Sequence, residues 1–305
     1  MAGVLSGFVP IWVLTVIGFL AARTNVLGER AEAVLGRFAF YLAMPAVLFT
    51  MLLDSEPGAL ANRGVLAFVI STFVVGTIGL VLFGKVFRRE LPDRALGAMA
   101  GAYVNSGNLG IPVAVGVLGD SSFMVAVLLF QPVIVMPMVL AAVEVGSGRR
   151  GGSLRTLATL PVRNPIILGS LLGVVVGATG WRPPRLVLEP LEALGSAGVP
   201  TALVVLGMSL NAMRAPDRDG RVEVSVTVVL KLLLHPLVTF LACLALGVDG
   251  PLRLAAVVCA ALPTAQNVYV LARQYRPDAR LPRDAVLVST ALSMVTLSVV
   301  AVLLQ

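Results

Sequence analysis

The chain has 305 residues, of which 58% are hydrophobic and 13% are charged, and its mean hydropathy is +0.95. Soluble globular domains carry about 25% charged residues, so the composition excludes a soluble globular protein and predicts an integral membrane protein. The net charge of +7 would suit a nucleic-acid-binding protein, but the basic residues lie in short loops and do not cluster with aromatic residues.

Apolar runs of about 20 residues, the length that crosses a bilayer as a helix, recur along the chain. We number them as spans one to ten: Val4–Ala22, Ala31–Leu53, Gly64–Val86, Ala95–Leu118, Phe123–Val145, Pro165–Ala178, Leu194–Asn211, Val224–Gly247, Leu252–Arg273 and Ala285–Leu304. The first run has no basic segment before it, so it predicts a retained span and not a cleaved signal peptide.

Basic residues between these runs predict how the spans are oriented. The loops after the odd-numbered spans contain 18 Lys and Arg residues, whereas the other loops contain only Arg63, Arg182, Arg185 and Arg253. Cytoplasmic loops are enriched in Lys and Arg. We therefore expect a multi-pass protein of the cytoplasmic (plasma) membrane, with both termini outside.

The two halves of the chain carry traces of an internal repeat. Prolines recur at offsets of 155, 155 and 151 residues in the pairs Pro10 and Pro165, Pro45 and Pro200, and Pro112 and Pro263. With five spans in each half, the halves enter the membrane from opposite sides. The predicted fold is an all-α integral membrane protein with ten transmembrane helices in a 5+5 inverted repeat. Residues 1–145 form the first repeat, 146–163 a basic, glycine-rich cytoplasmic linker, and 164–305 the second repeat.

Two spans carry polar residues and helix breakers at their centres. Span four contains Tyr103–Pro112, with two Asn, one Ser, two Gly and a Pro, and span nine contains Ala261–Tyr269, with Pro263 among polar residues. Non-helical backbone at membrane depth is tolerated only where it lines a cavity or is buried in protein. We expect two broken helices that cross, with half-helices starting near Pro112 and Pro263. Their electropositive N-termini would favour an anion, particularly a carboxylate.

These stretches supply the predicted substrate-binding residues: Asn105, Ser106, Gly107, Asn108, Gly110, Pro112, Pro263, Thr264, Gln266 and Asn267. The amides of Asn105 and Asn108 either orient the carboxylate or cap backbone groups that the break frees. The glycines and prolines are expected to shape the crossing, where their backbone can still contact substrate.

Lys231 and His235 lie one helical turn apart in span eight and are candidate coupling residues. The alternatives are that Lys231 extends to the cytoplasmic interface and that a neutral His235 bonds a neighbouring carbonyl. The central parts of the spans lack Asp and Glu, which argues against a carboxylate proton relay. Cys243 and Cys259 are expected to be buried free thiols. No nucleophile–base pair, phosphate-binding loop or metal-spaced His/Cys set appears, so we expect no enzyme, cofactor or metal site.

The residues also carry a resemblance. Asn105–Pro112 and Leu262–Tyr275 resemble the fourth-span and ninth-span motifs of the auxin efflux carrier family, and Leu42–Phe49 and Leu206–Leu210 fit its second and seventh spans. The resemblance implies crossed broken helices and transport of organic anions by an elevator-like motion. It implies a scaffold of spans one, two, six and seven, which is often dimeric, and a moving unit of the other spans. Asn105 matches an Asn that contacts the substrate carboxylate in the plant PIN-type carriers.

Two departures from the plant members refine this expectation. The long cytoplasmic loop of the plant proteins is absent, and Gln266 and Asn267 replace residues that are apolar in plants, which argues against auxin itself. The match is closer to prokaryotic members, for which malate or malonate is the usual suggestion. The leading hypothesis is a secondary carrier of dicarboxylates or auxin-like carboxylates. The alternatives are a sodium-coupled symporter similar to the bile-acid carriers and a receptor that binds a metabolite without transport.

Overall fold

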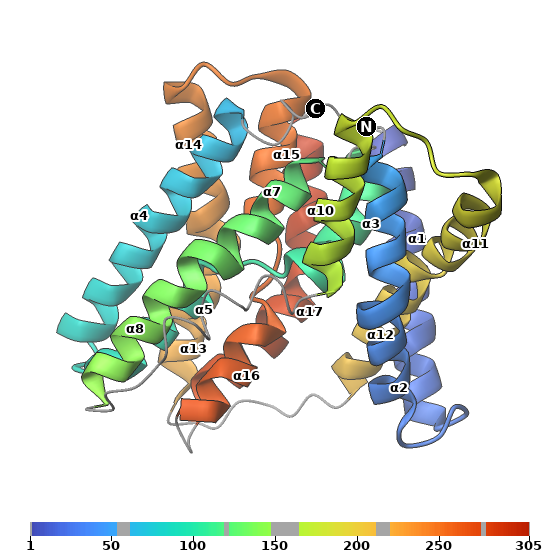
Figure 1. Ribbon diagram of the computed structural model, residues 1–305. Coiled ribbons are helices and arrows are strands. Elements are labelled where there is room, and N and C mark those ends of the chain that lie inside the picture. The colour runs from blue at the N-terminus through green and yellow to red at the C-terminus, as the bar shows by residue number, and fades with distance from the viewer. Residues whose placement is uncertain are drawn as a thin grey trace. The chain divides into compact units, whose positions relative to one another are not determined.

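The computed structural model describes residues 2–53, 62–118, 122–147, 165–211, 220–275 and 279–304 (Figure 1). All regular elements in this part of the chain are helices, and the one non-helical pairing is an isolated bridge between Val104 and Thr264. Residues 148–163, most of the predicted linker, lie outside the described ranges. The chain divides into two compact units, which are taken in turn.

The first unit comprises Met1–Asn62, Gly107–Leu129 and Thr159–Met213. Its described helical elements are α1 (Ala2–Thr24), α2 (Ala31–Phe38), η1 (Ala39–Ala43), α3 (Met44–Leu52), α6 (Ile111–Val113), η4 (Ala114–Leu118), α7 (Ser122–Phe130), α10 (Pro165–Ala178), α11 (Arg185–Ser196) and α12 (Gly198–Asn211). Spans one, two, six and seven, the expected scaffold, thus fall in one unit. Residues 107–129 join them, although that expectation assigned spans four and five to the moving unit.

Glycines allow the helices of the first unit to approach closely. Along α10, which packs against α3 (Figure 1), three glycines four residues apart face α3 backbone, so that added Cβ atoms would lie 2.5–2.7 Å from its carbonyl oxygens: Gly169 at Pro45, Gly173 at Phe49 and Gly177 at Leu53. Small residues of this spacing bring helix backbones together in membranes, where lipid supplies no hydrophobic driving force between helices.

The second unit comprises Arg63–Ser106, Phe130–Ala158 and Arg214–Gln305. Its described helical elements are α4 (Arg63–Lys85), α5 (Leu91–Ala102), η5 (Gln131–Val135), α8 (Met136–Gly146), α13 (Arg221–Val229), η7 (Leu230–Leu234), α14 (His235–Ala245), α15 (Gly250–Ala260), α16 (Gln266–Tyr275) and α17 (Arg280–Leu303). Within this unit α4 packs against α5 and α14, α14 against α15, and α13 against α17. A short π-helical element, η3 (Ser106–Gly110), begins at Ser106 of the second unit, and its other residues are assigned to the first unit.

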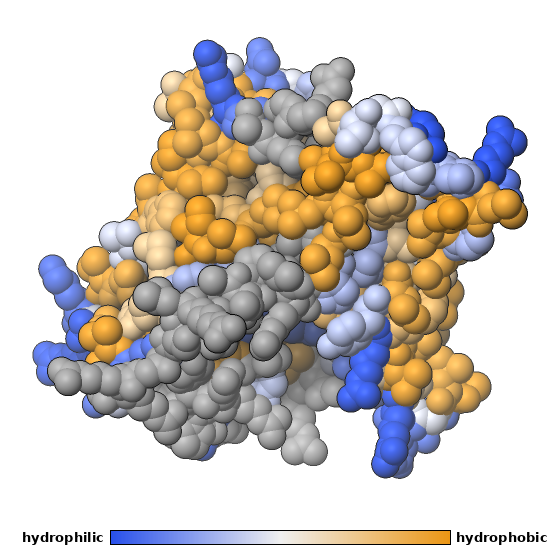
Figure 2. Space-filling view, viewed as in Figure 1, coloured by the Kyte–Doolittle hydropathy of each residue, from blue (hydrophilic) through white to orange (hydrophobic). Residues whose placement is uncertain are grey.

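The described helices are suited to a bilayer. Six of them are long and apolar enough to cross a membrane: Ala31–Leu52, Arg63–Lys85, Phe123–Gly146, Arg185–Asn211, Arg221–Ala245 and Arg280–Leu303. Four shorter apolar helices lie in predicted spans one, four, six and nine: Val9–Thr24, Ser106–Leu118, Leu168–Ala178 and Gly250–Ala260. Large apolar side chains are exposed on both units, and hydrophobic residues (orange) cover much of the face in Figure 2. Because an exposed apolar surface of this extent is unfavourable in water, the protein is a multi-pass helical membrane protein.

Four prolines inside helices are accommodated by π-helical turns. Pro45, Pro112, Pro137 and Pro236 each lie two residues after such a segment ends. In three of these places the residue before the proline donates its N–H to the carbonyl five residues earlier: Met44 to Ala39, Met136 to Gln131 and His235 to Leu230. The wider turn relieves the clash between the proline ring and the carbonyl four residues before it. These prolines therefore lie within helices and do not end them.

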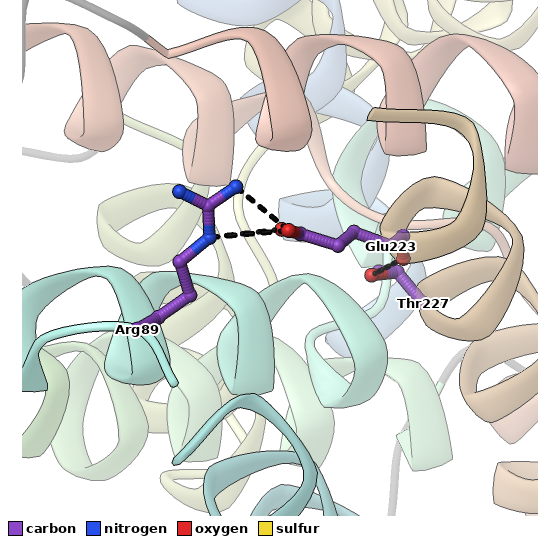
Figure 3. A network of polar contacts seen from close by, with 3 residues as sticks. All are labelled: Arg89, Glu223 and Thr227. Atoms are coloured by element: carbon purple, nitrogen blue, oxygen red, sulfur yellow. Dashed lines mark hydrogen bonds and ion pairs between the residues drawn. The ribbon is translucent and has the colours of Figure 1, made fainter. Parts of the chain in front are cut away.

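An ion pair joins two helix ends of the second unit (Figure 3). Arg89, which follows α4, donates from Nε and Nη2 to Glu223 Oε1 at 3.1 and 2.7 Å, and Glu223 lies in the first turn of α13. The hydroxyl of Thr227 donates to the Glu223 backbone carbonyl at 2.8 Å. The Arg89 side chain is 48% exposed, so solvent screens the pair.

Glu223→Gln is therefore expected to lower the free energy of unfolding by less than about 1 kcal/mol, because exposed ion pairs contribute little. Denaturation of the purified protein in detergent measures this difference. A loss of about 3 kcal/mol or more, the cost of breaking a buried pair, would contradict a peripheral role for this contact.

Candidate substrate site at two paired helix interruptions

The first interruption lies between α5 and η3. α5 ends at Ala102 because Tyr103 is extended, with φ −89° and ψ 117°, and the helix resumes at Ser106. The prediction that the second half-helix begins near Pro112 is wrong. Pro112 lies inside the resumed helix, after the π-helical turn that accommodates its ring.

The second interruption lies between α15 and α16. α15 ends at Ala260, residues 261–265 are not helical, and α16 begins at Gln266. Pro263 lies within this interruption, as the sequence predicts. The proline has no N–H to donate and sits where the helix has already ended.

The two interruptions pair with each other inside the second unit. Val104 and Thr264 form an antiparallel bridge. Beside it, the Asn105 N–H donates to the Pro263 carbonyl at 2.8 Å, and the Ala265 N–H donates to the Tyr103 carbonyl at 3.3 Å. Backbone groups that left two helices are thus satisfied partly by one another, as a buried backbone requires.

The helical hydrogen bond opened by the first interruption is replaced on both sides. In a continuous helix the Val104 N–H would donate to the Ala100 carbonyl. Instead, Val104 N donates to Gln131 Oε1 at 2.7 Å, and Ala100 O accepts from Thr264 Oγ1 at 2.6 Å. Gln131 Nε2 also donates to Val104 O and to Ser106 Oγ, both at 3.0 Å.

The second interruption follows the same plan with different side chains. The helical bond that is opened would join the Thr264 N–H to the Ala260 carbonyl. Thr264 N donates to Ser289 Oγ at 3.1 Å, and Ala260 O accepts from Lys231 Nζ at 2.6 Å. Each opened bond therefore has its donor and its acceptor satisfied by a side chain from another segment.

The predicted site residues divide between the units. The second unit holds Asn105, Ser106, Pro263, Thr264, Gln266 and Asn267 around the paired interruptions, and the first unit holds Gly107, Asn108, Gly110 and Pro112. Among the predicted site residues of the second unit, the side chains of Asn105, Ser106 and Thr264 are buried, that of Gln266 is half-buried and that of Asn267 is exposed. The Thr264 hydroxyl is committed to Ala100 O.

Lys231 and His235 are both fully buried in the second unit. Lys231 Nζ donates to Ala260 O and lies 2.9 Å from His235 Nδ1, while His235 Nε2 lies 3.3 Å from Thr72 Oγ1. The alternative that Lys231 extends to the interface is wrong, because the side chain turns toward the C-terminal end of α15. His235 bonds side chains and not a neighbouring carbonyl.

Sequence reasoning missed Gln131 and Ser289. Gln131 is 1% exposed and stands in an otherwise apolar run, so a search for lone polar residues inside spans could have found it. Ser289 is fully buried in α17 and carries no such signal, because serine is common in membrane helices. Cys243 and Cys259 are free and buried, as expected. Within the described ranges, no group of three or more His, Cys, Asp or Glu side chains could hold a metal ion.

The fold and these interruptions define a multi-pass helical membrane protein that keeps paired, non-helical backbone inside its second unit. Comparison with known proteins identifies the family. The chain matches the family model described as "Membrane transport protein" over residues 4–148 and 153–301. It therefore belongs to this family of transporters, which includes the auxin efflux carriers.

Three relatives from different organisms align over most of the chain. A protein of Rhizobium meliloti (strain 1021), named "Putative malonate transporter", is 28% identical over 98% of this chain and 95% of its own. An "Uncharacterized transporter" of Methanocaldococcus jannaschii is 24% identical over 94% of both chains. "Auxin efflux carrier component 8" of Arabidopsis thaliana is 20% identical over 89% of both chains.

Proposed function

We propose that this protein is a secondary carrier that moves small organic anions across the cytoplasmic membrane and binds them at the paired interruptions. The observation that carries the proposal is the pairing of Tyr103–Asn105 with Pro263–Ala265. An unbroken helix would satisfy these backbone groups without any side chain. Two interrupted membrane helices whose backbone groups are bonded by side chains therefore indicate a functional site.

The chemistry of the interruptions suits a carboxylate. Helices resume at Ser106 and at Gln266, and a helix start carries about half a positive charge. The nearby amides of Asn105, Gln266 and Asn267 can donate to carboxylate oxygens. Malonate, which appears in the name of the Rhizobium relative, is the type of small dicarboxylate that we propose as substrate.

We divide the predicted site residues into two roles. We assign substrate contact to the amides of Asn105, Asn108, Gln266 and Asn267. Ser106 and Thr264 belong to the framework, because their hydroxyls bond Gln131 and the Ala100 carbonyl. Gly107, Gly110, Pro112 and Pro263 shape the backbone around the interruptions.

We further propose the ten-span inverted repeat, with repeats 1–145 and 164–305, a linker at 146–163 and both termini outside. The opened helical bonds support it, because Ala100 and Ala260 are 160 positions apart, as are Val104 and Thr264. Grouping of spans one, two, six and seven in one unit supports an elevator-like motion of the second unit, although residues 107–129 group with the scaffold. We propose a homodimer through the scaffold helices.

Uptake into proteoliposomes tests the function. Labelled malonate, malate and indole-3-acetate are supplied with and without an imposed potential or sodium gradient. Asn105→Ala is expected to reduce uptake of the transported acid about tenfold, the effect of losing one charge-assisted hydrogen bond. Asn211→Ala, at the exposed end of α12, is the control and should transport like wild type.

Equal uptake by wild type and Asn105→Ala for every transported acid would contradict the site. A strict requirement for a sodium gradient would favour the symporter alternative. Saturable binding of an acid without any flux would favour a receptor.

A further inference from the structure

A fully buried lysine, Lys231 in η7, bonds the end of the helix before the second interruption, and the proposed substrate contacts do not explain it. Lys231 Nζ is held 2.6 Å from Ala260 O and 2.9 Å from His235 Nδ1. Among the described residues, no carboxylate lies within 4.0 Å of it. An ammonium group buried at membrane depth among neutral partners is costly, so its position calls for an explanation.

Hydrogen-bond directions show how this lysine is held. The Thr72 hydroxyl donates to Phe68 O at 2.8 Å, so its oxygen is left to accept from His235 Nε2–H. His235 Nδ1 then carries the lone pair and accepts from Lys231 Nζ. The chain of donors runs from Lys231 through His235 and Thr72 to a backbone carbonyl of α4, and it fixes the imidazole tautomer.

The held ammonium replaces a backbone amide. Ala260 O is the acceptor that loses the Thr264 N–H when α15 ends, and Lys231 supplies the missing donor. Ala260 lies three residues before Pro263, whose carbonyl accepts the Asn105 N–H in the pairing. In the first interruption the corresponding carbonyl, that of Ala100, is held by the neutral hydroxyl of Thr264. Of these two donors, only Lys231 can carry a positive charge.

We propose that Lys231 is a positioning residue of the anion site: held by His235 and Thr72, it fixes the α15 end of the second interruption, and the bound anion balances its charge. The bound anion in this inference rests on the proposed function. The hydrogen bonds that join Lys231, His235 and Thr72 are observed independently of it. Losing Lys231 should therefore weaken substrate binding more than it slows the transport step.

The first test examines the hydrogen bonds from Lys231 through His235 to Thr72 by NMR, without any substrate. The sequence contains two lysines, Lys85 and Lys231, and Lys85 is exposed at the end of α4. In protein labelled with ¹⁵N-lysine, Lys231→Met assigns the two Nζ resonances. The Lys231 protons should exchange with solvent much more slowly than those of Lys85. Thr72→Val should shift the Lys231 resonance, whereas Thr227→Val should not, since Thr227 is buried in the same unit and its hydroxyl bonds only its own helix.

Equal exchange at the two lysines, or identical Lys231 resonances in the two threonine variants, would overturn this chain of hydrogen bonds. The result holds whether or not any of the tested acids is transported, so it separates this inference from the proposed function.

The second test measures KM and Vmax for uptake into proteoliposomes. Lys231→Met should raise KM for the transported acid about tenfold with Vmax within about threefold of wild type, the pattern of lost binding. Lys85→Met is the control and should change neither. Thr72→Val, which removes one hydroxyl, should raise KM by a smaller factor. This variant provides the test if Lys231→Met does not fold. An unchanged KM in a folded Lys231→Met or Thr72→Val protein would overturn the positioning role.

Discussion

Gln131→Leu is expected to lower the free energy of unfolding by about 3–5 kcal/mol and to abolish anion uptake. Gln131 makes three hydrogen bonds to the first interruption, two of them to the N–H and carbonyl of Val104. Val104 is fully buried, so leucine would leave its N–H unsatisfied and away from water, while its carbonyl would keep only the bond from Ser106 N–H. The unsatisfied N–H costs about 1–3 kcal/mol and each of the two other lost hydrogen bonds about 0.5–1.5 kcal/mol, while the similar volume of leucine creates no large cavity.

Gln131→Glu is the informative companion. A carboxylate keeps an acceptor for the Val104 N–H but has no hydrogen to donate to Val104 O or Ser106 Oγ. A buried carboxylate is itself costly, so at a pH where the carboxyl is ionised, stability and uptake should fall at least as far as those of Gln131→Leu. Denaturation in detergent and uptake into proteoliposomes measure both quantities. If Gln131→Leu retained wild-type stability and uptake, the first interruption would not depend on this side chain.

Gly207→Ala is the second substitution with a large expected effect, and it acts in the first unit. A Cβ at Gly207 would overlap the backbone carbonyl of Thr15 and lie 2.8 Å from Phe19 N, where α12 packs against α1. Neither atom belongs to a side chain that could rotate away. The helices must separate, and overpacking of this kind costs about 1–3 kcal/mol. Gly207→Val should cost more, because it adds two further methyl groups at the contact.

Gly76→Ala provides the matched control. Gly76 also lies inside a helix, α4, but a Cβ there meets nothing within 4 Å. Alanine should therefore leave stability unchanged or raise it by about 0.5–1 kcal/mol, because glycine is the poorer helix former. Both variants are compared by unfolding in the same detergent. Equal stability of Gly207→Ala and Gly76→Ala would contradict the close contact between α1 and α12.

Much of the helical architecture could be predicted from the sequence, because apolar runs and loop charges follow directly from the bilayer. The clustered Asn, Ser, Gly and Pro residues also located the interruption in span four. Its position within that stretch was missed. Proline alone does not end a helix, and the π-helical turn before Pro112 keeps the helix intact. A π-helical turn depends on hydrogen bonds to the carbonyl five residues earlier, and no residue pattern in the sequence predicts them.

The groups that hold the interruptions were largely out of reach of sequence reasoning. Gln131 and Ser289 act on backbone atoms that are 27 and 25 residues away in the chain. Such contacts depend on tertiary packing. The sequence also left open whether Lys231 extends to the interface, because only packing of α14 on α15 brings its Nζ to Ala260.

Protection of an introduced thiol tests most directly whether anions bind at the paired interruptions. Asn267→Cys places a thiol on an exposed position at the start of α16, in a background with Cys243→Ala and Cys259→Ala. Lys85→Cys in the same background is the control site. A transported acid should slow modification by a charged methanethiosulfonate reagent at position 267 and not at position 85, with half-protection near the KM for uptake measured with the same Asn267→Cys variant. Modification of position 267 at the same rate with and without a saturating acid would contradict the account.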